Sequence, residues 1–156
     1  MLPSEFIDRT ADHVRILLSG EGTGHDWWHV HRVWRTAQRI GQTEGADLLV
    51  VELASLLHDI ADWKTHGGDT RIGPTRARNW LASLGLAPTV TEHVCQIIAH
   101  ISFTGAGVER PTLTLEGQVV QDADRLDALG AIGIARAFAY GGARGRLIHD
   151  PTARPQ

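Results

Sequence analysis

Hydrophobic residues recur along most of the chain at the spacing of amphipathic helices. The pattern predicts a first helix capped by Ser4 and stopped by the glycines around Gly20, and then helices over about 26–44, 47–61, 74–84, 88–101 and 115–140. The helix over 47–61 is densest in Leu, Val and Ala, so we expect it to be the most buried. The last helix is expected to break near Gly130. Strand patterns are weak throughout, and the fold class predicted is therefore all-α.

The length of 156 residues suits one domain, which would bury roughly 70% of its unfolded surface. Residues 1–141 are expected to form this domain. Residues 142–156 contain several Gly, Arg and Pro and predict a flexible tail, the start of a missing C-terminal helical part.

Charge and cysteine content narrow the function classes. The net charge is −3 and no run of Lys or Arg is present, which argues against long nucleic acids as partners. Cys95 is the single cysteine, so no intrachain disulfide can form and a reducing compartment fits. The N-terminal residues do not resemble a signal peptide, and no apolar run approaches the roughly 20 residues that span a bilayer. We therefore expect a cytoplasmic protein that does not insert into membranes.

The nine histidines are the main chemical signal. His58 and Asp59 end the most apolar stretch, where an unpaired buried charge would cost several kcal/mol. A divalent cation would satisfy both, although a His-Asp pair in isolation more often bonds internally or caps a helix. Upstream, His25 and His29 are four residues apart and share one helical face, whereas His31 is expected on the surface.

A group of three aspartates follows the apolar residues Val119 and Val120. They are Asp122, Asp124 and Asp127. Asp124 lies at the edge of the apolar stripe, where an acid needs a partner; the alternative is a solvated face on which Arg125 pairs locally.

The ordered set His29, His58-Asp59 and Asp124 resembles the H…HD…D signature of the HD-domain metal-dependent phosphohydrolases. The stretches GHDWWHVHRVWRTA, LLHDIADWK and VVQDADRLDALGAIGIARAFAYGG are similar to short bacterial nucleotide pyrophosphohydrolase-like proteins of this superfamily, over about residues 24–151. The resemblance implies a single-domain HD-domain helical bundle. It also implies one divalent cation held by these four residues, with Mn²⁺ preferred and Mg²⁺, Ni²⁺, Co²⁺ or Fe²⁺ as alternatives. The implied activity is hydrolysis of nucleoside triphosphates to the monophosphate and pyrophosphate.

Two acid/base candidates accompany the ligand set. Asp62 stands where related HD nucleotidases carry a catalytic Glu, so the resemblance implies an acid/base role; a plain surface acid is the alternative. His25 is a candidate to orient the attacked phosphate or to support His29.

Three basic residues are candidates for substrate binding. Lys64 follows the His-Asp pair and can hold a phosphate as a point charge, or can simply be solvated. Arg32 and Arg125 flank ligand residues and can either bind phosphate or brace carboxylates, with bracing favoured for Arg125.

Other functions fit the same residues. A phosphomonoesterase or a phosphodiesterase would use the same metal on a different phosphate ester. A di-iron oxygenase would need extra ligands, for which His66, His93 and His100 are the candidates. A non-catalytic metal or nucleotide sensor is a third class. The oligomeric state stays open, with a homodimer as one candidate.

Overall fold

A computed structural model of the chain describes residues 1–21, 24–61, 69–101 and 112–152. These residues form helices and contain no strand, which confirms the all-α prediction. In chain order the helices are α1 (Pro3–Leu17), α2 (Trp27–Glu44), α3 (Leu48–Leu57), α4 (Ile72–Ser83), α5 (Pro88–Ile101), α6 (Leu115–Asp127) and α7 (Gly130–Ala143).

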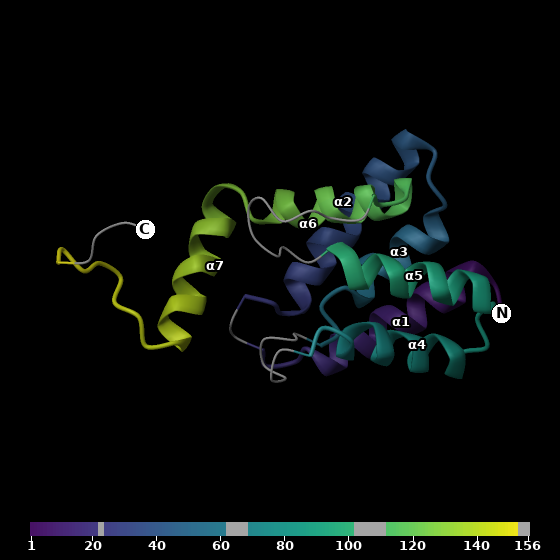
Figure 1. Ribbon diagram of the computed structural model, residues 1–156, viewed down its shortest axis with the longest axis horizontal. Coiled ribbons are helices and arrows are strands. Elements are labelled where there is room, and N and C mark those ends of the chain that lie inside the picture. The colour runs from purple at the N-terminus through teal and green to yellow at the C-terminus, as the bar shows by residue number, and fades with distance from the viewer. Residues whose placement is uncertain (22–23, 62–68, 102–111, 153–156) are drawn as a thin grey trace.

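Helix α3 forms the centre of the core. Residues 50–57 are all buried, as its uniformly apolar sequence predicts. It packs against α1, α2, α5 and α6, which surround it in the body of the molecule (Figure 1). Helix α2 also packs along α6, so the ends of α2, α3 and α6 can contribute side chains to one place.

Aspartate caps fix where α2 and α3 begin. The Asp26 carboxylate accepts a hydrogen bond from the backbone N–H of His29 at 2.9 Å, and Asp47 accepts one from Leu49 at 3.0 Å. A carboxylate at this position satisfies N–H groups that have no partner within the helix. The cap at Asp26 therefore places His29 in the first turn of α2.

Two predicted helix ends were wrong. Helix α1 begins at Pro3, with Leu2 rather than Ser4 in the capping position, because proline is preorganised for a first helical turn and Glu5 accepts from the Leu2 N–H at 2.6 Å. Helix α3 ends at Leu57 instead of residue 61. The ring of His58 hydrogen-bonds the carbonyl of Ser55 at 2.7 Å there, and the chain turns.

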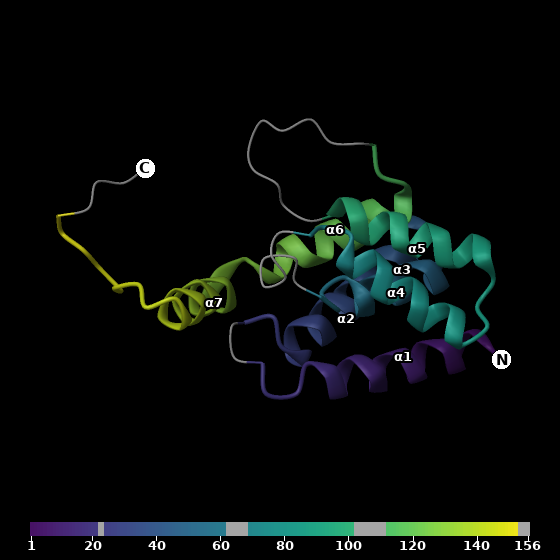
Figure 2. The same cartoon turned by 60° about the horizontal axis from the view of Figure 1, so that its bottom comes forward.

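The break between α6 and α7 lies where the sequence predicted it. Gly130 has φ +64°, and a Cβ at Gly133 would lie 2.0 Å from the carbonyl oxygen of Ala128. Only glycine fits such a close approach. Helix α7 leaves the body at this turn and has no buried residue (Figures 1 and 2). Its last turn includes residues 142 and 143, which were predicted to belong to the tail.

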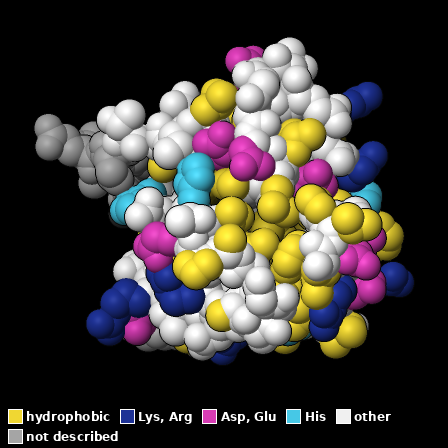
Figure 3. All heavy atoms as spheres, turned by 90° about the vertical axis from the view of Figure 1, so that its right-hand side faces the viewer, with side chains coloured by type: hydrophobic (Ala, Val, Ile, Leu, Met, Phe, Trp, Pro, Cys, Tyr) yellow, Lys and Arg dark blue, Asp and Glu magenta, His cyan; other side chains and the backbone are white. Residues whose placement is uncertain are grey.

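In the described part of the chain, lysine and arginine side chains form no continuous patch on the face of the molecule that lies opposite α7 (Figure 3). Lysine and arginine side chains there are scattered and mixed with acidic ones around a group of hydrophobic side chains (Figure 3). Among the described helices, none is long and apolar enough to cross a membrane.

Candidate metal centre

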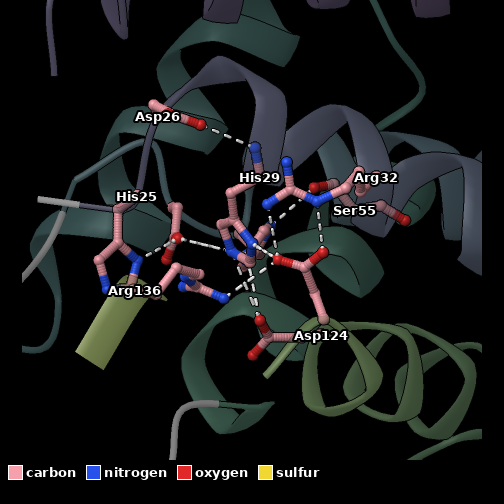
Figure 4. A network of polar contacts seen from close by, with 10 residues as sticks. His25, Asp26, His29, Arg32, Ser55, Asp124 and Arg136 are labelled. Carbon is pink, nitrogen blue, oxygen red and sulfur yellow. Dashed lines mark hydrogen bonds and ion pairs between the residues drawn. The ribbon is translucent and has the colours of Figure 1, made fainter. Parts of the chain in front are cut away.

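Four side chains from three segments lie close together, and Figure 4 shows two of them, His29 and Asp124, directed toward each other. His29 comes from the first turn of α2, and His58 and Asp59 come from the turn after α3. Asp124 comes from the last turns of α6. The four residues that the sequence analysis assigned to a metal are thus brought together.

Their potential ligand atoms are close neighbours. The Nε2 atoms of His29 and His58 are 3.2 Å apart. The Oδ2 atom of Asp59 lies 3.3 and 3.4 Å from these two nitrogens, and the Oδ1 atom of Asp124 lies 3.5 and 3.8 Å from them. Ligands about 2.0–2.2 Å from one ion are separated from their neighbours by about 3–3.4 Å, so the spacing fits a shared cation.

The hydrogen bonds around the two imidazoles determine which ring nitrogens face the centre. The Nδ1 atom of His29 lies 2.7 Å from a carboxylate oxygen of Asp127, and the Nδ1 atom of His58 lies 2.7 Å from the carbonyl oxygen of Ser55. Both oxygens only accept, so each Nδ1 carries the proton and each neutral ring directs an Nε2 lone pair at the centre. Two lone pairs and two carboxylates in one place require a cation or a proton.

Without a metal, the titration of His58 and Asp59 reflects this requirement. Burial lowers the pKa of His58, but the charge of Asp59, its hydrogen bond and the charge of Asp124 outweigh burial and raise the pKa to about 9. Burial raises the pKa of Asp59, but the charge of the protonated His58 and the hydrogen bond from His25 outweigh burial and hold this pKa well below its usual range. The site therefore retains a positive charge between its carboxylates.

His25 lies beside this group. Its Nδ1 atom donates to the Asp59 carboxylate at 2.7 Å, and this hydrogen bond raises the pKa of His25 against the opposing effect of burial. Atoms of His25, His29 and Asp59 are close enough to share a cation, as are atoms of His29, His58 and Asp124, and the two groups have His29 in common.

The site is open on one side. The His29 side chain is fully buried and that of His58 is 4% exposed, whereas Asp124 and His25 are 35% and 34% exposed. A substrate can therefore approach the centre from the side of Asp124 and His25.

Asp127 belongs to this network, although the sequence analysis did not select it. Its carboxylate, 7% exposed, accepts from His29 and from two nitrogens of Arg32, at 2.6 and 3.0 Å. Arg136 of α7 donates to it at 3.1 Å. The spacing of three residues between Asp124 and Asp127, one helical turn, was the available signal that both face the same way.

The other predicted site residues have varied positions. Arg32 pairs with Asp127, which is the bracing alternative. Arg125 is exposed and lines a surface hollow with Ile40 and Leu129, and none of the four proposed metal ligands lines this hollow. Asp62 and Lys64 lie outside the described residues.

Two of the three candidates for a second metal, His93 and His100, contact residues outside this centre. His93 hydrogen-bonds Thr114, and His100 hydrogen-bonds the carbonyl of Gln96. His66 lies outside the described residues. In the part of the chain that the structure describes, the potential metal-binding groups all include His29.

The chain is thus an all-α domain with a candidate metal site of two histidines and two aspartates. Comparison with known proteins identifies its family: residues 27–129 match the HD domain, and the chain belongs to this family. It is a member of the HD-domain phosphohydrolase superfamily, as the sequence motifs implied.

The chain is similar along most of its length to larger bacterial proteins. It is 45% identical over 138 residues to YpgQ of Bacillus subtilis (strain 168), covering 87% of this chain and 66% of YpgQ. The crystal structure of YpgQ in complex with ADP superposes with a TM-score of 0.78, at 39% identity, over 96% of this chain and 72% of that one.

Two further crystal structures are similar. A Lactobacillus plantarum protein superposes with a TM-score of 0.84 at 34% identity, over all of this chain and 72% of that chain. An HD-superfamily hydrolase of Bacillus thuringiensis superposes with a TM-score of 0.72 at 41% identity, over 99% of this chain and 74% of that one.

Proposed function

We propose that this protein is a metal-dependent phosphohydrolase that converts nucleoside triphosphates to the monophosphate and pyrophosphate. The observation that carries the proposal is the convergence of His29, His58, Asp59 and Asp124 on one point with an open side. The description of a similar Bacillus thuringiensis protein as an HD-superfamily hydrolase supports the reaction class.

These four residues would hold one divalent cation, with Mn²⁺ as our choice. Two imidazoles and two carboxylates form a mixed nitrogen and oxygen set that suits first-row divalent metals. When bound, the cation supplies positive charge to a phosphoryl group and makes water more acidic. The four side chains would leave the solvent-facing side of the site, beside Asp124 and His25, for the substrate.

His25 is our candidate for the group that handles a proton or orients the attacked phosphate. Its Nδ1 atom is held by Asp59, which leaves Nε2 on the opposite edge of the ring for a substrate. It is one of the more exposed side chains of the centre, so a phosphate on the open side would be within its reach. Asp62 remains a second acid/base candidate on the sequence resemblance alone.

The proposal of a nucleotide substrate rests on the ligand found in the crystal structure of a similar protein. YpgQ, which is 39% identical in its solved structure, was crystallised with ADP. The active-site residues of this chain fit a phosphate ester in general, and the nucleotide is the more specific part of the proposal. Lys64 stays a candidate for a phosphate contact from its place in the sequence, and Arg32 would combine such a contact with its pairing to Asp127. Arg125 lines a hollow with Ile40 and Leu129 and is the weaker candidate.

A product assay tests this function. Protein stripped with a chelator is given a panel of nucleoside triphosphates with and without Mn²⁺, and pyrophosphate and orthophosphate are measured separately. The proposal predicts pyrophosphate and nucleoside monophosphate only when the metal is present. Asp59→Asn should abolish the products, and Asp122→Asn, an exposed carboxylate on α6, is the matched control.

The other outcomes separate the alternatives. Orthophosphate without pyrophosphate would retain the hydrolase and change the bond that is cut. Release of product from monoesters or cyclic nucleotides alone would favour the phosphomonoesterase or the phosphodiesterase. Tight metal and nucleotide binding without any product would contradict the proposal and favour a sensor.

A further inference from the structure

Asp127 receives an unusual concentration of hydrogen bonds for a residue outside the predicted ligand set. Its Oδ1 accepts from Nε of Arg32 at 2.6 Å. Its Oδ2 accepts from Nη2 of Arg32 at 3.0 Å, from Nη1 of Arg136 at 3.1 Å and from Nδ1 of His29 at 2.7 Å. Two arginines and one histidine, from α2 and α7, thus meet on one nearly buried carboxylate at the end of α6.

We propose that Asp127 is a positioning residue for the metal ligand His29, and that Arg32 and Arg136 hold the carboxylate in place. This inference rests on the proposed metal site. An imidazole can carry its proton on either nitrogen, and it binds a metal only through the deprotonated one. By accepting from Nδ1, Asp127 fixes the proton there and directs the Nε2 lone pair toward His58 and the two ligand carboxylates.

The two arginines have complementary roles. Arg32 is three residues from His29 on the same helix, so both side chains lie on one face of α2. The contact of Arg32 with both carboxylate oxygens therefore holds Asp127 beside His29. A planar guanidinium that contacts both carboxylate oxygens also limits rotation of the carboxylate. Arg136 approaches from α7 and contacts the oxygen that binds His29. The carboxylate is therefore oriented from two helices.

Arg136 also connects α7 to the centre. Helix α7 has no buried residue, but the Arg136 side chain is only 18% exposed. Its stem lies against Gly24, where φ is +93° and an added Cβ would come within 3.1 Å of Cγ of Arg136. The position of α7 thus affects the carboxylate that orients His29, and Figure 4 shows Arg136 entering the network from that helix.

The test uses Asp127→Ala and Arg136→Gln in the full chain. Their controls are Asp122→Ala, an exposed carboxylate on the same helix, and Arg144→Gln, an exposed arginine just after α7 that lies over Tyr140. Circular dichroism establishes that each variant is folded. The dissociation constant for Mn²⁺ is measured by competition with a chelating dye, and the visible spectrum of the Co²⁺ form reports the ligand geometry.

Loss of a carboxylate that orients a histidine ligand typically weakens metal binding by about 10–100-fold. We expect this loss and an altered Co²⁺ spectrum in Asp127→Ala, a smaller loss in Arg136→Gln, and wild-type behaviour in both controls. A folded Asp127→Ala variant with wild-type affinity and spectrum would overturn the inference. If Asp127→Ala does not fold, the test uses Arg136→Gln, which leaves the carboxylate in place. A folded Arg136→Gln variant with wild-type Mn²⁺ affinity and Co²⁺ spectrum would then overturn the inference.

A second readout separates this inference from the metal site itself. Ring ¹⁵N chemical shifts of the metal-free protein report which nitrogen of His29 is protonated. The inference predicts the Nδ1–H form in the wild type and a mixture of forms in Asp127→Ala. If wild-type protein bound no metal, the proposed function would fail, whereas unchanged ¹⁵N shifts in a folded Asp127→Ala variant would contradict the positioning role alone.

Discussion

The Nε2 atoms of His29 and His58 face each other across 3.2 Å, although the Nδ1 atom of each ring is already hydrogen-bonded to an oxygen. Two neutral imidazoles in this arrangement direct lone pairs at each other and gain nothing from their proximity. Asp59 and Asp124 bring further acceptors to the same point. The arrangement needs a metal cation or a proton among these atoms, and the predictions for Asp59 and His58 follow from this requirement.

Replacement of Asp59 by asparagine should remove most of the metal. Asp59 contributes a negative charge within 3.4 Å of both ligand nitrogens, and Asp124 alone would hold a hard cation weakly. Substitution of a residue that hydrogen-bonds a metal ligand typically weakens metal binding by roughly 10–100-fold. Because Asp59 is itself a proposed ligand, we expect a larger loss of Mn²⁺ affinity. Metal content after gel filtration, measured by mass spectrometry, checks this. Stoichiometric metal in folded Asp59→Asn would contradict the ligand assignment.

Replacement of His25 by asparagine should separate binding from turnover. His25 hydrogen-bonds the ligand Asp59 through Nδ1, and we assign it a role in the reaction rather than a bond to the metal, although it lies close enough to His29 and Asp59 to share a cation with them. The variant should therefore keep its metal and lose turnover by about 10²–10⁴-fold, the usual contribution of a positioned acid or base. Steady-state kinetics under saturating Mn²⁺ provide the measurement, with His149→Asn, an exposed histidine, as the control. Wild-type kcat in His25→Asn would remove its role in the reaction.

The metal-free protein should lose stability at alkaline pH. The neighbouring carboxylates raise the folded-state pKa of His58 from 6.5 to about 9, against the effect of burial. Because the folded protein holds this proton more tightly than the unfolded chain, the stabilisation is complete below pH 6.5 and disappears as the pH rises through about 9. Urea unfolding with a chelator present, at several pH values across this range, measures the effect. A free energy of unfolding that stays flat across the range in the wild type would contradict it.

Truncation of the central helix should destabilise the whole domain. Leu53 in α3 is fully buried among the helices that carry the site. Leu53→Ala should lower the free energy of unfolding by about 2–5 kcal/mol. Ile16→Ala, at a residue 75% exposed in α1, should change it by less than about 0.5 kcal/mol. Equal effects of the two substitutions in denaturant titrations would show that α3 is not the core.

Much of the fold was predictable because its signals are local. The caps at Asp26 and Asp47, the glycine after α2 and the apolar run of α3 lie next to the elements that they define. The start of α1 at Pro3 was missed because serine is the commoner cap. The early end of α3 coincides with a contact between the His58 ring and the Ser55 carbonyl, which the apolar pattern of the helix does not indicate.

The ligand set was predictable from the order of its motifs, whereas the residues that support the ligands were predictable only in part. His29, His58, Asp59 and Asp124 each stand out beside an apolar run. The role of Arg32 as a partner of Asp127 depends on the packing of α2 against α6, which no local pattern encodes. Arg136 enters the centre from α7 only because of the turn at Gly130 and Gly133, and a turn angle cannot be read from helical periodicity.

The central claim is that these four side chains hold one divalent cation. Crystals grown with Mn²⁺ and measured at the manganese absorption edge test it most directly. The account predicts one anomalous peak within bonding distance of Nε2 of His29, Nε2 of His58 and the carboxylates of Asp59 and Asp124. No peak at this position in metal-saturated crystals, or a peak that one of the two histidines does not contact, would contradict the account.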